Sequence, residues 1–273
     1  MIAWPFDPSV DGGLVALSLG YAWLARRVGA PRHKALYFWI GLLVVWLALE
    51  TPLDTVADHY LMSAHMAQHM LLMAAAPPFL LLGLDRTMAA VLLRVPLLPR
   101  LTEPVLAQAA YAAAMIGWHI PWLYMLALKD PVVHVVEHLV FLAASTLFWW
   151  PAIRATRVSS RWPLSEPGVV VYLLTGMLPM MAVSLPLQFS RNLFYPLYGS
   201  APRLIPSITP VIDQNIAGAV MMLMEMAATG VDAVIVSYRW LGEAVRSDLE
   251  RQQQSSAASD RQASVDDGAA ARP

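Results

Sequence analysis

Long apolar segments alternate with short polar ones along most of this chain. Seven of the apolar segments approach the roughly 20 residues that a helix needs to cross a bilayer, with ends uncertain by roughly 2–4 residues. Their approximate ranges are about 12–28, 34–50, 60–82, 102–127, 131–151, 167–187 and 210–238. We therefore predict an all-α, polytopic membrane helix bundle with seven transmembrane helices in residues 1–242.

Prolines interrupt several of these segments. Proline removes a backbone donor and clashes with the preceding turn of a helix. Pro77 and Pro78 are expected to kink or end the third helix, Pro121 to do the same in the fourth, and Pro179 and Pro186 to break up the sixth. The pattern changes again after about Gly242, where small and polar residues dominate. Residues 243–273 are therefore predicted to form a disordered cytoplasmic tail.

Basic residues gather on one side of the predicted bundle. Lysine and arginine are favoured in cytoplasmic loops, so their distribution predicts orientation. The side that holds the C-terminus carries 15 of the 18 basic residues: Arg26, Arg27, Arg32, Lys34, Arg86, Arg94, Arg100, Arg154, Arg157, Arg161, Arg239, Arg246, Arg251, Arg261 and Arg272. Only Lys129, Arg191 and Arg203 fall on the other side. We predict an external N-terminus and a cytoplasmic C-terminus.

Composition supports the membrane setting and narrows the chemistry. Hydrophobic residues make up 58% of the chain and charged residues 14%, whereas soluble domains carry roughly 25% charged residues. A net charge of −1 gives no sign of nucleic-acid binding. Cysteine is absent, which excludes disulfides, iron–sulfur clusters and thiolate metal sites. No basic residue precedes Arg26, so a cleaved signal peptide is not expected at the N-terminus.

Two pairs of histidines lie within the apolar segments. His65 and His69 are four residues apart in SAHMAQHMLLMAAAPPFLLLG, and His134 and His138 repeat that spacing in a later segment. Residues four apart share one face of a helix. Histidine is costly inside a bilayer and marks a functional site by default. Together with His119 of the fourth segment, these residues are candidate ligands of a metal or haem.

The predicted topology places the histidines at matching depths. At about 1.5 Å per residue, His69, His119 and His138 lie roughly 10–13 Å below the external surface. His65 and His134 lie one turn further out. We predict that the deeper three bind one copper ion and that the outer two form a relay or a second site. A lone histidine in a helix bundle is more often a hydrogen-bonded core residue, but five at matched depth favour a site.

Other polar and sulfur-containing residues are less clearly assigned. Glu137 adjoins His138 but points about 100° away from it on a helix. Asp213 fits two roles, either the N-cap of the last helix or a partner that orients a histidine. Most of the 15 methionines are expected to be apolar filler. Met73 and Met115 are the better candidate ligands, because each lies one turn below a histidine.

Imidazole and thioether without thiolate favour copper, as Cu(I), although these residue types leave zinc and iron open.

Two other functions also stay open at this point. A membrane haem-b electron-transfer protein could use His69 and His138 as axial ligands. A copper permease would need ligands that continue to the cytoplasmic side. No nucleophile with its base is evident, so the protein is not expected to be an enzyme.

The motifs resemble one known family. The segment around His65 and His69, WHIPWLY at 118–124, VVHVVEHLVFLAASTLFWWP at 132–151 and DQNIAGAVMMLMEM at 213–226 are similar to those of the CtaG-type cytochrome c oxidase assembly proteins of bacteria. The resemblance covers nearly all of the chain up to about Tyr238. It implies a multi-pass protein of the bacterial inner (plasma) membrane that acts as a metallochaperone for the respiratory chain. It also maps His65, His69, His119, His134 and His138 onto the family's histidine positions.

The same resemblance implies the partners. These would be the copper-containing subunits of a terminal oxidase, with the lipid bilayer as the surroundings. The sequence leaves open whether the protein forms a homo-oligomer.

Overall fold

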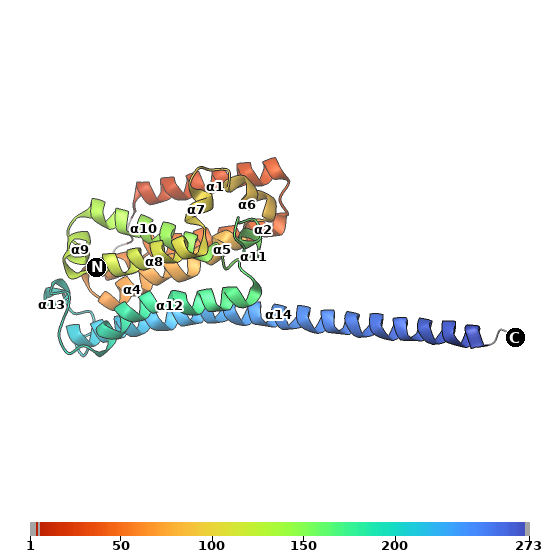
Figure 1. Ribbon diagram of the computed structural model, residues 1–273. Helices are drawn as coiled ribbons and strands as arrows, with labels where there is room; N and C mark the ends of the chain where they lie inside the picture. The colour runs from red at the N-terminus through yellow and green to blue at the C-terminus, as the bar shows by residue number, and fades with distance from the viewer. Residues whose placement is uncertain (1–3, 5, 271–273) are drawn as a thin grey trace.

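The structure, a computed structural model, describes residue 4 and residues 6–270, and these form an all-helical bundle (Figure 1). The long helices are α1 (Pro8–Val28), α2 (Arg32–Leu49), α8 (Pro104–Trp118), α10 (Pro131–Trp149), α12 (Glu166–Phe189) and α14 (Pro210–Ala270). The short ones are α3 (Pro52–His59), α6 (Arg86–Leu92), α7 (Leu98–Leu101), α9 (Pro121–Ala127), α11 (Arg154–Arg157) and α13 (Leu197–Ser200). The predicted all-α class is confirmed for the described residues.

A central rod organises the bundle. It consists of α4 (Met62–Met70), a π-helical turn η1 (Leu71–Ala75) and α5 (Ala76–Leu82). The rod packs against α2, α3, α10 and α14, while α12 packs along α14 and α8. Methionines at 62, 66, 70 and 73 of the rod are almost completely buried. The rod therefore forms the core around which the other helices are placed.

The π turn lies directly before the two prolines of the rod. Pro77 has no N–H to donate to the carbonyl of Met73, four residues earlier. The indole Nε1 of Trp149 donates to that carbonyl instead, at 3.1 Å. The expected irregularity thus takes the form of a π turn with an external donor, and the helix continues to Leu82.

The other prolines act in two different ways. Pro121 begins α9, so the predicted segment 102–127 consists of two helices with His119 at the break. Pro179 and Pro186, by contrast, lie inside α12, which runs unbroken from Glu166 to Phe189. The expectation that they break up this segment was wrong. Neighbouring helices can support a proline-containing membrane helix, and α12 packs along α14.

Among the described residues, five helices or helix runs are long and apolar enough to cross a membrane. They are Arg32–Leu49, Met62–Leu82, Pro131–Trp149, Glu166–Phe189 and Pro210–Ser255. Helices α1 and α8 occupy the other two predicted segments but are not among these five. The break at His119 leaves α8 with 15 residues. The count of seven spans and the orientation therefore stay predictions.

The two ends of the bundle differ in their side chains. Helices α6 and α11 lie at the end from which α14 projects, and α9 and α13 lie at the opposite end (Figure 1). At the α6–α11 end, basic residues surround a cavity of about 500 Å³; they are Lys34, Arg86, Arg154, Arg157 and Arg239. Basic residues from several predicted cytoplasmic segments thus meet at one end of the molecule.

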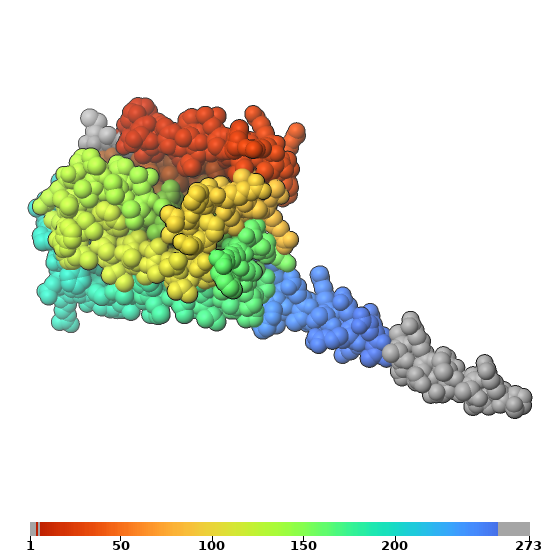
Figure 2. Space-filling view, turned by 45° about the horizontal axis from the view of Figure 1, so that its top comes forward, coloured from red at the N-terminus to blue at the C-terminus, as the bar shows by residue number. Residues whose placement is uncertain are grey.

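Helix α14 extends well beyond the bundle. It continues through Ala270, where the sequence predicts a disordered tail after about Gly242. Its residues from Tyr238 to Ser255 are all exposed, and the helix projects away from the body of the protein (Figure 2). No proline interrupts the chain between Pro210 and Pro273, and this absence is compatible with a long continuous helix.

Candidate metal centre

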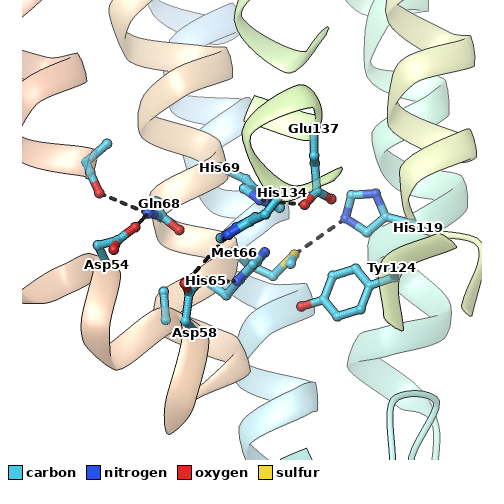
Figure 3. A network of polar contacts seen from close by, with 12 residues as sticks. Asp54, Asp58, His65, Met66, Gln68, His69, His119, Tyr124, His134 and Glu137 are labelled. Atoms are coloured by element: carbon cyan, nitrogen blue, oxygen red, sulfur yellow. Dashed lines mark hydrogen bonds and ion pairs between the residues drawn. The ribbon is translucent and has the colours of Figure 1, made fainter. Parts of the chain in front are cut away.

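Two helices bring four potential metal ligands together at the end of the bundle opposite the basic cavity. His65 and His69 lie on α4, and His134 and Glu137 lie on α10 (Figure 3). One ligand atom from each residue can be chosen so that all four lie within 4.8 Å of one another. His65, His69 and Glu137 are at most 2% exposed. We call these four residues the His–Glu cluster.

Helical spacing explains why these side chains meet. His65 and His69 are four residues apart and their ring centroids are 4.2 Å apart. Glu137 follows His134 by three residues, so both project from the same face of α10. The ring of His65 stacks on that of His134 at 5.5 Å, and His69 Nε2 lies 3.9 Å from Glu137 Oε2. Each helix thus contributes one pair of ligands to the cluster.

Asp213 fixes the start of the helix that carries two of the histidines. Leu61, the N-cap residue of α4, has no side chain able to cap it. Asp213 of α14 accepts instead from the backbone N–H groups of Met62, at 2.7 Å, and Ser63, at 3.2 Å. Buried helix N-termini need such acceptors. Asp213 therefore caps a neighbouring helix, which is neither of the two roles considered from the sequence.

Asp58 of α3 lies behind two of the rings. Its carboxylate oxygens are 3.7 Å from His65 Nδ1 and 3.6 Å from His134 Nδ1. Burial acts to raise the pKa of Asp58, but its interactions with His65 and His134 outweigh burial and hold the pKa below its ordinary value. A carboxylate here favours protons on both Nδ1 atoms, which leaves the Nε2 lone pairs available to a cation.

A second carboxylate ties α3 to the rod. Gln68 donates from Nε2 to Asp54 Oδ1 at 2.7 Å and to the carbonyl of Ala48 at 3.0 Å. Burial, together with the charge of Asp58, raises the pKa of Asp54 to about 7, although the bond from Gln68 acts in the opposite direction. Asp54 and Gln68 hold α3, and therefore Asp58, against the histidine-bearing part of α4.

Most polar atoms of the cluster have no hydrogen-bond partner among the described residues. This is true of both ring nitrogens of His65 and of His69, Nε2 of His134 and both carboxylate oxygens of Glu137. Buried polar atoms without partners are costly. Imidazole nitrogens and carboxylate oxygens are also donors that first-row transition metals accept. The arrangement fits a bound metal cation, which would satisfy several of these atoms together.

The remaining two predicted histidines lie beside the cluster. The ring centroid of His138 is 4.3 Å from that of His134 and 5.4 Å from that of His69. His119 lies at the α8–α9 break, with its ring centroid 6.4 Å from that of His69. All five predicted histidines thus meet at one end of the bundle. The tightest group, however, is not the trio of His69, His119 and His138 expected from depth.

A family model for the cytochrome c oxidase caa3 assembly factor matches residues 18–243. The chain belongs to this family. The match covers both helices of the His–Glu cluster, His119, and the start of α14 with Asp213. Comparison of the chain with the curated proteins, and with the solved structures, gave no match.

The candidate site includes residues that sequence reasoning missed. Glu137 was judged by its angle to His138, whereas its three-residue spacing from His134 is the signal that places it in the cluster. Asp58 was not among the residues predicted for the site. The methionine sulfur in contact with a histidine nitrogen is that of Met66, which was not singled out from the sequence; Met66 Sδ lies 3.5 Å from His119 Nε2.

Proposed function

We propose that this protein binds copper at the His–Glu cluster and passes it to the copper-containing subunits of a terminal oxidase. The observation that carries the proposal is the set of buried nitrogen and oxygen atoms without hydrogen-bond partners on His65, His69 and Glu137. Three imidazoles and one carboxylate form a donor set that suits copper. The negative charge of Asp58 behind two of the rings supports the binding of a cation.

The proposed setting is the inner (plasma) membrane of a bacterium, with seven transmembrane helices. The basic cavity would face the cytoplasm and the His–Glu cluster the periplasm, which places the N-terminus outside and the C-terminus inside. The work of the protein in this proposal is to hold and release an ion. No covalent bond of a substrate needs to be made or broken, so we propose that the protein is not an enzyme.

The geometry favours copper transfer over the two alternatives. A haem with two axial histidines must lie between their rings, but His65 and His69 are in edge contact at 4.2 Å and His138 is 5.4 Å from His69. A permease would need ligands along the whole rod. The part of the rod beyond the π turn, Ala76–Leu82, contains only apolar residues.

Copper binding by the purified full-length protein tests the proposal. Copper content and Cu(I) affinity would be measured in detergent, with a chromophoric Cu(I) chelator as competitor. His69→Ala and Glu137→Gln should weaken binding by more than about tenfold, the lower end of the loss that follows removal of partners outside the ligand set. His33→Ala is the matched control, because His33 lies at the start of α2, outside the cluster.

Oxidase activity links this binding to function. Membranes with the His69→Ala protein should show reduced cytochrome c oxidase activity at limiting copper, and added copper should partly restore it by mass action. Wild-type copper affinity in both cluster variants would refute the site. A strong Soret band in the purified protein would support the haem alternative. Copper uptake into sealed vesicles would support a permease.

A further inference from the structure

His119 and Met66 form a second pair of donor atoms next to the His–Glu cluster. The Nε2 atom of His119 faces the Sδ atom of Met66 at 3.5 Å (Figure 3). Met66 is fully buried and His119 is 7% exposed. Met66 comes from the same helix as His65 and His69, while His119 comes from the break between α8 and α9. Two elements therefore hold the pair. One is α4, which also carries His65 and His69, and the other is the α8–α9 break, which carries no residue of the cluster.

The hydrogen bonding of His119 defines which nitrogen carries the proton. Its Nδ1 lies 2.7 Å from the carbonyl of Met115, which can only accept, so Nδ1 is the protonated nitrogen. In the neutral ring Nε2 then has a free lone pair. That lone pair faces a thioether sulfur, which also has lone pairs to share. Two acceptors in contact have no hydrogen between them, so this contact is not explained by an ordinary hydrogen bond.

The ring is held in this orientation by its surroundings. The Met115 carbonyl belongs to the last turn of α8, where carbonyls have no partner within the helix. The hydroxyl of Tyr195 donates to the backbone carbonyl of His119 at 2.8 Å, which fixes the chain at the break. Nε2 is therefore directed at Met66 by two separate hydrogen bonds. Orientation of one ring nitrogen through a bond to the other is typical of metal-binding histidines.

We infer that His119 and Met66 form a soft-donor site for Cu(I), separate from the His–Glu cluster. With bonds of about 2.0 Å to nitrogen and about 2.3 Å to sulfur, and an angle near the tetrahedral value, the two donor atoms would lie about 3.5 Å apart. The observed separation is 3.5 Å. Thioether sulfur prefers Cu(I), whereas the carboxylate of the cluster is a harder ligand.

This inference rests on the proposed function and adds a second site with a different preference for metal ions. The ring centroids of His119 and His69 are 6.4 Å apart, close enough for an ion to move between the two sites with small side-chain movements. The His119–Met66 pair would hold Cu(I). The nitrogen and oxygen donors of the cluster would also accept divalent ions. A divalent probe should consequently report on the cluster alone, whereas Cu(I) should report on both sites.

X-ray absorption at the copper edge of the full-length protein, loaded with Cu(I) without oxygen, tests this site. The wild type should show a sulfur neighbour at about 2.3 Å. Met66→Leu should lose this neighbour and bind less Cu(I), while its Zn(II) binding stays at the wild-type level. His119→Asn should behave in the same way, because the amide can still donate to Met115 while the Nε2 ligand is gone. Met73→Leu is the control for loss of a buried methionine.

The outcomes separate this inference from the proposed function. A sulfur neighbour that persists in Met66→Leu, or that disappears in Met73→Leu, would overturn the His119–Met66 site. Copper bound only by nitrogen and oxygen in the wild type would overturn the site and leave the cluster proposal standing. Absence of copper binding to the wild type would overturn both. Size-exclusion profiles and thermal unfolding would establish that each variant is folded.

Discussion

The two ends of the bundle both bury charged and polar groups, but they balance them differently. At the end with α6 and α11, both signs of charge surround one cavity, and Arg157 is paired with Glu166. At the other end, the His–Glu cluster gathers imidazole nitrogens and a carboxylate, most without a partner among the described residues. In the first arrangement acidic and basic side chains lie around the same cavity, although Arg157 Nε and Nη1 and Asp232 Oδ2 have no hydrogen-bond partner among the described residues. The second contains histidines and one carboxylate but no lysine or arginine, and this difference supports the cluster as the proposed metal-binding site.

The largest expected effect on stability is at the end with α6 and α11. Arg157→Ala should lower the free energy of unfolding by about 3–5 kcal/mol, because it leaves Glu166 without its buried partner. Arg157→Lys should lose less, since it keeps the charge but not the planar guanidinium. Reversible unfolding in mixed detergents would measure both. A loss below about 1 kcal/mol for Arg157→Ala, as for a surface pair, would show that this end is solvated.

The binding end should respond to copper instead. Saturating the wild type at about 100 times its dissociation constant should raise the free energy of unfolding by about 2.7 kcal/mol. In His69→Leu this gain should be smaller, whereas the metal-free protein should change by less than about 1 kcal/mol, because an unpartnered polar side chain is replaced by an apolar one. Equal copper stabilisation in His69→Leu and wild type would contradict the comparison of the two ends.

The cap on α4 should give a smaller effect that combines stability and binding. Asp213→Ala should cost about 1 kcal/mol of stability, as for other helix caps. It should also weaken copper binding, because α4 positions His65 and His69. Asp85→Ala is the matched control, since Asp85 caps α6 at the other end of the bundle. A loss of stability without a change in copper affinity would mean that the cap does not influence the site.

The smallest effect is expected where α14 leaves the bundle. Arg154 and Glu243 form an ion pair at 3.2 Å, and both side chains are about half exposed. Glu243→Gln should change stability by less than about 1 kcal/mol. Thermal unfolding in low and high salt would measure it. A larger loss would show that the projecting part of α14 is anchored to the bundle more strongly than its exposure indicates.

Helical periodicity was sufficient to predict the elements of the fold. Each of the seven predicted segments contains helix, because long apolar runs are a strong signal. The consequences of proline were less predictable. Pro121 ends a helix while Pro179 and Pro186 lie within one, and the difference depends on neighbours that the sequence does not place.

The candidate site was predictable in part. The i,i+4 histidine pairs identified α4 and α10, but the rotation of each helix about its axis decides which side chains meet. In the structure, Glu137 lies in the cluster, Asp58 lies behind two of its rings, and Met66 lies opposite His119. Asp213 could not be assigned from the sequence, because it acts on a helix 150 residues earlier in the chain.

Because of the π turn at Leu71–Ala75, the direction in which the histidines of α4 point depends on the exact number of residues in the rod. A π turn contains one residue more than the equivalent α-helical path, so it offsets the angular phase of α4 relative to α5 by about 100°. Deleting one residue there would leave the hydropathy of the segment almost unchanged. It would nevertheless turn His65 and His69 away from α10 if α5 kept its packing. The residue count between the histidines and the double proline is therefore as much a part of the site as the histidines themselves.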